Sequence, residues 1–97
     1  MKFEDLVKAD LRLVVLLSLA QDAGYAHNEY VLKEMLSHLG HTVSRDKLRT
    51  ELAWLKEQGL VELVDVTGTM VAKLTRRGKD VSEGAVVVPG VKRPEPM

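Results

Sequence analysis

The sequence contains no cysteine, which excludes disulfide bonds, thiolate zinc sites and cysteine nucleophiles. Aromatic residues make up only 4% of the chain, so its core must be aliphatic. Its uninterrupted apolar run at 13–17 is far shorter than the roughly 20 residues that cross a bilayer. Charged residues interrupt the apolar positions near the N-terminus, which argues against a signal peptide. We therefore expect a cytoplasmic protein with no membrane partner.

Net charge is also lacking, because 14 basic residues balance 14 acidic ones. A protein that coats DNA would be basic, since neutralisation of phosphates supplies most of the non-specific affinity. Any surface for nucleic acid must therefore come from the local arrangement of cations. A chain of 97 residues has room for one small domain.

The stretch Val43 to Gly59 organises the rest of the chain. Ser44 is a good N-cap, because its hydroxyl accepts a hydrogen bond from an amide in the first helical turn. Three leucines then recur at helical spacing and predict one buried stripe: Leu48, Leu52 and Leu55. Gly59 is typical of the residue with positive φ that ends a helix.

Two helices are predicted upstream. The first covers residues 3–21 and is followed by a loop at 22–27, in which Gly24 can act as the C-cap. Asn28 caps the second helix, which Gly40 ends, and a short turn leads to Ser44. The first helix is apolar around most of its circumference. It is either a central core helix or a homodimer contact that covers Leu11, Val15 and Leu19.

Downstream, residues 60–66 and 70–74 read as paired strands with a turn at 67–69. Thr75 caps a short final helix. After Gly84, the tail at 85–97 holds all three prolines and is predicted to be flexible, although its valines at 86–88 can pack on the domain or on a partner. This order predicts an α+β winged helix-turn-helix domain over 1–84, with three helices, a two-stranded wing and a short C-terminal helix.

The third helix carries the residues expected to contact DNA. Recognition helices present their early residues to the groove, so Arg49 and Thr50 are predicted to read bases. Arg45, Arg76 and Arg77 are predicted to hold phosphates. Ser44, Lys47 and Lys73 complete this set. The alternative is a solvated helix of mixed charge. Trp54, the sole tryptophan, is expected to anchor the wing or a partner chain.

Two segments resemble winged-helix regulators of the ArsR, MarR and PadR kind. They are Gly59-Leu60-Val61, where the helix joins the wing, and the run Leu74 to Val81, where the wing joins the last helix. The resemblance implies a winged-helix fold. The metal-binding cysteines of ArsR sensors are absent, so no metal-responsive regulation is implied.

A narrower resemblance runs over nearly the whole chain. It is carried by Val43 to Asp46, Leu52 to Leu55 and Val88 to Pro94. These segments look like a family of small winged-helix proteins encoded in Mu-like prophages and often labelled ArsR-like. The resemblance implies a phage-encoded protein.

No catalytic constellation emerges, and we expect neither enzyme activity nor a cofactor or metal. His38 and His41 lie near serines, but a triad also needs a third group that orients the base and an oxyanion site. The leading hypothesis is a transcriptional regulator that binds double-stranded DNA. The alternative is a protein-interaction module for a phage partner, for example in assembly or packaging, which fits the zero net charge and the acidic wing tip.

Overall fold

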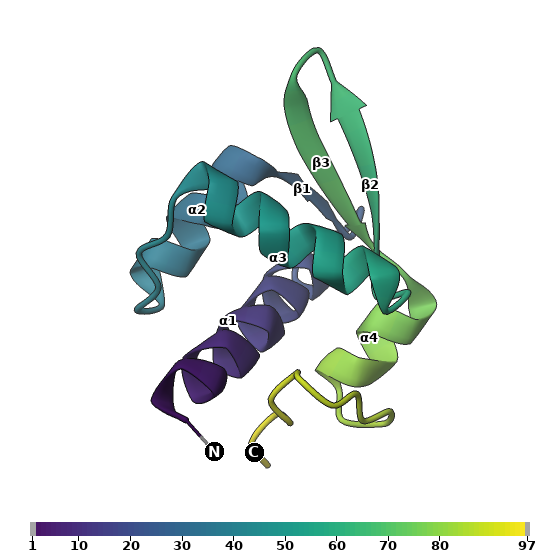
Figure 1. Cartoon of the computed structure of the whole chain (residues 1–97). Coiled ribbons are helices and arrows are strands. Elements are labelled where there is room, and N and C mark those ends of the chain that lie inside the picture. Colours follow the sequence, from purple (N-terminus) through teal and green to yellow (C-terminus); the bar gives the residue numbers. More distant parts are fainter. Residues whose placement is uncertain (1, 97) are drawn as a thin grey trace.

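The computed structural model describes residues 2–96 of the chain. The described elements run in the order α1 (Phe3–Ala20), β1 (Ala26–Asn28), α2 (Glu29–His38), α3 (Arg45–Glu57), β2 (Val61–Val66), β3 (Thr69–Leu74) and α4 (Arg76–Ser82). They form an α+β fold whose antiparallel sheet has the strand order β1-β3-β2. The hairpin of β2 and β3 projects away from the helices, and the tail returns to the first helix (Figure 1).

The predicted helix caps are confirmed. The side-chain oxygens of Asn28, Ser44 and Thr75 each accept a hydrogen bond from a backbone N–H in the first turn of α2, α3 and α4. These bonds satisfy amides that have no partner within a helix. Local sequence chemistry therefore sets where three of the helices begin.

The predicted turn between β2 and β3 is also confirmed. Val66 pairs with Thr69, so Thr67 and Gly68 are the two turn residues. Their φ angles are 50° and 89°, as a two-residue hairpin turn that matches the strand twist requires.

The two predicted strands pair as expected, but the prediction of a loop over the whole of 22–27 is wrong, because a third strand begins at Ala26. Ala26 to Asn28 form β1, which pairs with β3 in a register that places His27 opposite Ala72. The physical reason is non-local, because a strand this short is stabilised by a partner more than forty residues away rather than by its own propensity. Helix α1 ends at Ala20, and Tyr25 rather than Gly24 takes the left-handed conformation, with φ 58°.

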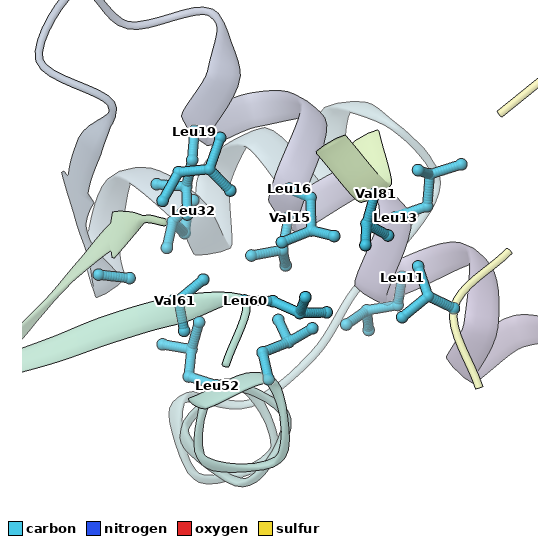
Figure 2. Packing of buried hydrophobic residues seen from close by; sticks show 14 of the residues in the cluster. Leu11, Leu13, Val15, Leu16, Leu19, Leu32, Leu52, Leu60, Val61 and Val81 are labelled. Atoms are coloured by element: carbon cyan, nitrogen blue, oxygen red, sulfur yellow. The ribbon is translucent and has the colours of Figure 1, made fainter. Parts of the chain in front are cut away.

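The core is aliphatic, as predicted from the scarcity of aromatic residues. The leucine stripe of α3 is fully buried in one cluster with side chains from α1, α2 and β2. Figure 2 shows Leu52 of this stripe pointing toward Val61. Leu11, Val15 and Leu19 belong to this core, with exposed fractions of 2% or less. The prediction that these three residues contact a second copy is therefore wrong, because one chain already covers them.

The tail packs on the domain instead of hanging free. Val88 and Val91 are buried, and the amide of Lys92 donates to the carbonyl of Ala9 in α1 over 3.1 Å. The physical reason is that α1 leaves an apolar flank beside α4, and the valines of the tail cover it.

Trp54 anchors this tail and not the hairpin. The guanidinium of Arg12 lies 3.7 Å above the centre of the Trp54 ring, and its Nη1 donates to the carbonyl of Gly90 over 3.0 Å. A Cβ atom at Gly90 would lie 2.9 Å from the same ring. Arg12, Trp54 and Gly90 thus clamp the tail across α1 and α3.

Candidate nucleic-acid interface

A buried carboxylate organises the start of α3. Glu29, the first residue of α2, has a fully buried side chain. Its two oxygens accept hydrogen bonds from Nε and Nη2 of Arg49 at 2.8 Å each, and from the same atoms of Arg45 at 3.0 and 3.3 Å. Two arginines that were predicted to contact DNA therefore bind one acid inside the protein.

The same network reaches the tip of the hairpin. Nη2 of Arg45 and Nη2 of Arg49 both donate to the carbonyl oxygen of Gly68, over 2.7 and 3.0 Å. The amide of Met70 donates to Glu29 over 2.6 Å. Helix α2, helix α3 and the hairpin are consequently joined at one point, which we call the Glu29 hub: Glu29, Arg45, Arg49, Gly68 and Met70.

The electrostatics of the hub favour the charged state of its three ionisable side chains, Glu29, Arg45 and Arg49. Hydrogen bonds from Arg49, and then from Arg45 and the Met70 amide, hold the pKa of Glu29 far below its ordinary value, although burial acts in the opposite direction. The carboxylate in turn raises the pKa of both arginines. Charge-assisted, bidentate bonds of this kind are the strong class of protein hydrogen bonds.

A second buried acid holds the opposite side of α3. Glu51 accepts hydrogen bonds from Nε of Arg12 at 2.7 Å and from Nζ of Lys47 at 3.1 Å. Burial alone would raise the pKa of Glu51, but these two cations lower it. Lys47, another residue predicted to contact DNA, is thus paired within its own helix.

The polar residues at the start of α3 lie on its surface. Ser44 caps the helix through its Oγ and is exposed. Thr50 is exposed, and its hydroxyl donates to the carbonyl of Asp46 one turn earlier, over 3.1 Å. The predicted contact residues Ser44, Arg45, Arg49 and Thr50 therefore share the first half of α3, with an acid, Asp46, among them.

The remaining predicted residues lie at the other end of α3. Lys73, Arg76 and Arg77 are exposed around the junction of β3 and α4, and Lys79 follows them. Nε of Arg77 donates to the carbonyl of Gln58 at the end of α3, over 3.0 Å. Within residues 2–96, none of these four cations lies within 4.0 Å of a carboxylate oxygen. We call them the basic junction.

The hairpin between these two regions is apolar and acidic. Val64 and Val66 of β2 are 58% and 50% exposed. Asp65 accepts a hydrogen bond from the amide of Gly68 at 2.7 Å, which braces the turn. The hairpin itself supplies Lys73 as its one cation.

Sequence reasoning missed Glu29 and its role. An acid in the first turn of a helix is ordinarily explained by the helix dipole, and that signal is all the sequence offers here. Its partners lie 16 and 20 residues further along the chain, so only the fold brings them together.

The described residues offer neither a membrane-spanning helix nor a metal site. No helix in this part of the chain combines the length and apolar character needed to cross a membrane. Across residues 2–96, no group of three or more His, Asp or Glu side chains lies close enough to hold a metal ion.

Together, the fold and this surface define a small α+β protein whose third helix and hairpin are tied into one exposed unit. No known family profile matches the chain. It is 47% identical over 92 residues to uncharacterized protein gp26 of Escherichia phage Mu, a match that covers 95% of both chains. It is 46% identical over 78 residues to an uncharacterized protein of Haemophilus influenzae, covering 79% of this chain and 76% of that one. The chain therefore belongs to a family of small phage-encoded proteins that includes gp26 of phage Mu, which confirms the predicted phage kinship.

Proposed function

We propose that this phage protein is a winged helix-turn-helix regulator that binds double-stranded DNA. The element order supports this assignment, because helix, strand, two helices joined by a short turn, and a hairpin are the parts of a winged helix. In this scheme α3 is the recognition helix and the hairpin of β2 and β3 is the wing.

The observation that carries the proposal is the Glu29 hub. A protein that reads DNA needs its recognition helix and wing in a fixed relation, because side chains must reach base edges and phosphates together. The hub supplies that relation by binding the start of α3 and the tip of the wing to one buried carboxylate.

The hub leaves part of both guanidinium groups available. The side chains of Arg45 and Arg49 are 42% and 33% exposed. Among residues 2–96, neither Nη1 atom makes a hydrogen bond, so each retains donors for an external acceptor. Two cations with one acid also leave the hub with a net positive charge.

We assign the contacts as follows. Thr50 and the exposed edge of Arg49 face base edges in the major groove, while Arg45 contacts the flanking phosphate. At the far end of α3, Lys73, Arg76 and Arg77 contact a second stretch of backbone. The phosphate contacts set the register, and the groove contacts set the sequence preference.

The test is a fluorescence anisotropy titration with a labelled duplex from the regulatory region of the phage that encodes the protein, repeated over a range of salt concentrations. Arg76→Ala should weaken binding to all sequences alike and reduce the slope of log K against log salt by about 0.9. Lys33→Ala removes an exposed cation from α2 and is the matched control. Binding that is absent at low salt, or equal in Arg76→Ala and wild type, would refute the proposal.

Arg49→Ala, the obvious variant, is a poor first test. It removes two of the hydrogen bonds that neutralise Glu29, so it perturbs the wing as well as the groove. Thr50→Val changes only an exposed hydroxyl. It is expected to alter preference at one base position by about 1–3 kcal/mol while leaving binding to random duplexes unchanged.

A second candidate function is a protein-interaction module. The exposed Val64 and Val66 beside Asp65 favour it, because an apolar and acidic hairpin suits a protein surface better than a phosphate backbone. A pull-down from phage-infected cells compares wild type with Val64→Lys. Loss of a phage protein partner in the variant, with no DNA binding in either, would favour this function over the regulator.

Self-association is proposed through a different part of α1 from the one predicted. Phe3 and Leu6, in the first two turns, are 79% and 53% exposed, and Val7 lies beside them. Two copies related by a twofold axis would cover the same residues on each other. Light scattering at micromolar concentration tests this, with Phe3→Lys as the variant expected to be monomeric. A wild type that stays monomeric at all concentrations contradicts it.

A further inference from the structure

A small pocket opens beside the basic junction. It lies between the turn that precedes β1 and the start of α4, and its volume is about 230 Å3. Its lining consists of Tyr25, Leu74, Thr75, Arg76 and Lys79, with no acidic residue. Sites for drug-sized ligands occupy about 300–1,000 Å3, so this pocket suits a smaller group.

Two of the residues that line the pocket are cations. Arg76 and Lys79 are three residues apart on α4, which places them on one face of the helix. Within residues 2–96, neither lies within 4.0 Å of a carboxylate oxygen. Like charges at this spacing repel each other, and an anion bound between them would remove the repulsion.

Tyr25 is held over the same pocket. Its amide donates to the carbonyl of Asp22 over 3.0 Å, and its carbonyl accepts from the amide of Leu74 over 2.8 Å. These bonds keep Tyr25 in the left-handed conformation, with its ring centre 5.5 Å from Nζ of Lys79. Its hydroxyl makes no hydrogen bond among residues 2–96, so one of the residues that line the pocket keeps a free donor.

Thr75, the N-cap of α4, lines the pocket, but its hydroxyl is already bonded within the chain. The Oγ1 of Thr75 accepts from the amide of Gly78 at 3.0 Å and donates to the carbonyl of Gly59 at 2.7 Å. The Thr75 hydroxyl is therefore satisfied within the chain, and the polar side chains left to bind a ligand are those of Tyr25, Arg76 and Lys79.

We propose that this pocket binds a phosphate group. A guanidinium matches the geometry of phosphate oxygens, an ammonium adds a second charge, and a phenol hydroxyl supplies one more donor. The phosphate comes either from the DNA backbone or from a free phosphate. The first source rests on the proposed function and extends the backbone contact of Arg76 to Tyr25 and Lys79, while the second source does not depend on DNA binding.

The test is an NMR titration of the 15N-labelled full chain with inorganic phosphate, with sodium chloride adjusted to keep the ionic strength constant. The amides of Tyr25, Leu74 and Lys79 should shift saturably. Arg76→Ala and Lys79→Ala should each weaken the affinity about tenfold, the effect of one charge-assisted hydrogen bond. Lys56→Ala, an exposed cation of α3 outside the pocket, is the control and should bind as wild type does.

The absence of saturable shifts would refute phosphate binding at this pocket. An equal loss of phosphate affinity in Arg76→Ala, Lys79→Ala and Lys56→Ala would refute it too. Thermal unfolding of each variant verifies that it is folded, and Tyr25→Phe provides a milder change that removes only the hydroxyl. Titration of a DNA duplex separates the two sources. Competition between duplex and inorganic phosphate, with weaker duplex binding by Lys79→Ala, identifies a backbone site. Phosphate binding without any DNA binding leaves the pocket intact and refutes the proposed function alone.

Discussion

Replacing Glu29 with glutamine tests the physical basis of the hub. The side-chain volume is kept, but the amide group turns N–H donors toward the donors of Arg45 and Arg49. The native carboxylate accepts five hydrogen bonds, four from the arginines and one from the amide of Met70. Glu29→Gln therefore leaves several of these donors without an acceptor.

The magnitude follows from burial. Breaking a buried, hydrogen-bonded ion pair costs about 3–5 kcal/mol, and because both guanidinium groups stay partly in water we expect the lower end, about 3 kcal/mol. Urea unfolding at pH 7, followed by the fluorescence of Trp54, measures this loss. Glu34→Gln is the control, because Glu34 lies on the same helix with its side chain 77% exposed.

The same variant changes the pH dependence. A carboxyl whose pKa is lowered in the folded state stabilises the protein above its unfolded pKa, near 4.3, and loses that contribution as pH falls below it. Wild type should therefore lose stability between pH 5 and pH 3 more steeply than Glu29→Gln. A variant that is less than about 1 kcal/mol destabilised at pH 7, or has the wild-type pH slope, would refute the role given to Glu29.

Other predictions concern close packing. Gly78→Ala should destabilise the protein by about 1–3 kcal/mol in urea unfolding, because its Cβ would lie 2.1 Å from the carbonyl oxygen of Leu60. Replacing glycine with alanine within a helix usually stabilises a protein, so a gain in stability here would contradict this prediction. Gly90→Ala should lose more stability than Gly40→Ala and change the fluorescence of Trp54. Both glycines have positive φ, 97° and 93°, but a Cβ at position 40 meets open space. Equal losses would show that the clamp on the tail tolerates a side chain.

Much of the fold was predictable because its signals are local. Asn28, Ser44 and Thr75 act on amides within three residues, and Gly68 meets a conformational demand of its own turn. The leucine stripe of α3 follows from helical spacing alone. Each of these features depends on a few neighbouring residues, so it can be predicted directly from the sequence.

The failures share a non-local cause. Strand β1 depends on the edge offered by β3, and the burial of Val15 depends on the elements that close over α1. The apolar circumference of α1 was consistent with a core helix or a dimer contact, and only the packed chain distinguishes the two for Leu11, Val15 and Leu19.

For the same reason, only part of the candidate site could be predicted from the sequence. Its residue types and their place on α3 were predicted, but not the partner that occupies Arg45 and Arg49. Ion pairs between residues sixteen or more apart leave no periodic signal, and the position of Glu29 reads equally well as dipole compensation.

The most direct test of the central claim is an NMR titration of the 15N-labelled protein with a duplex of about twenty base pairs from the phage regulatory region. A winged helix that reads DNA predicts one footprint with two parts, the first half of α3 from Ser44 to Thr50 and the junction from Lys73 to Arg77. Both parts should shift together and weaken together as salt is raised. The absence of shifts at low salt, or shifts confined to Val64 and Val66 on the hairpin, would contradict DNA recognition through this surface.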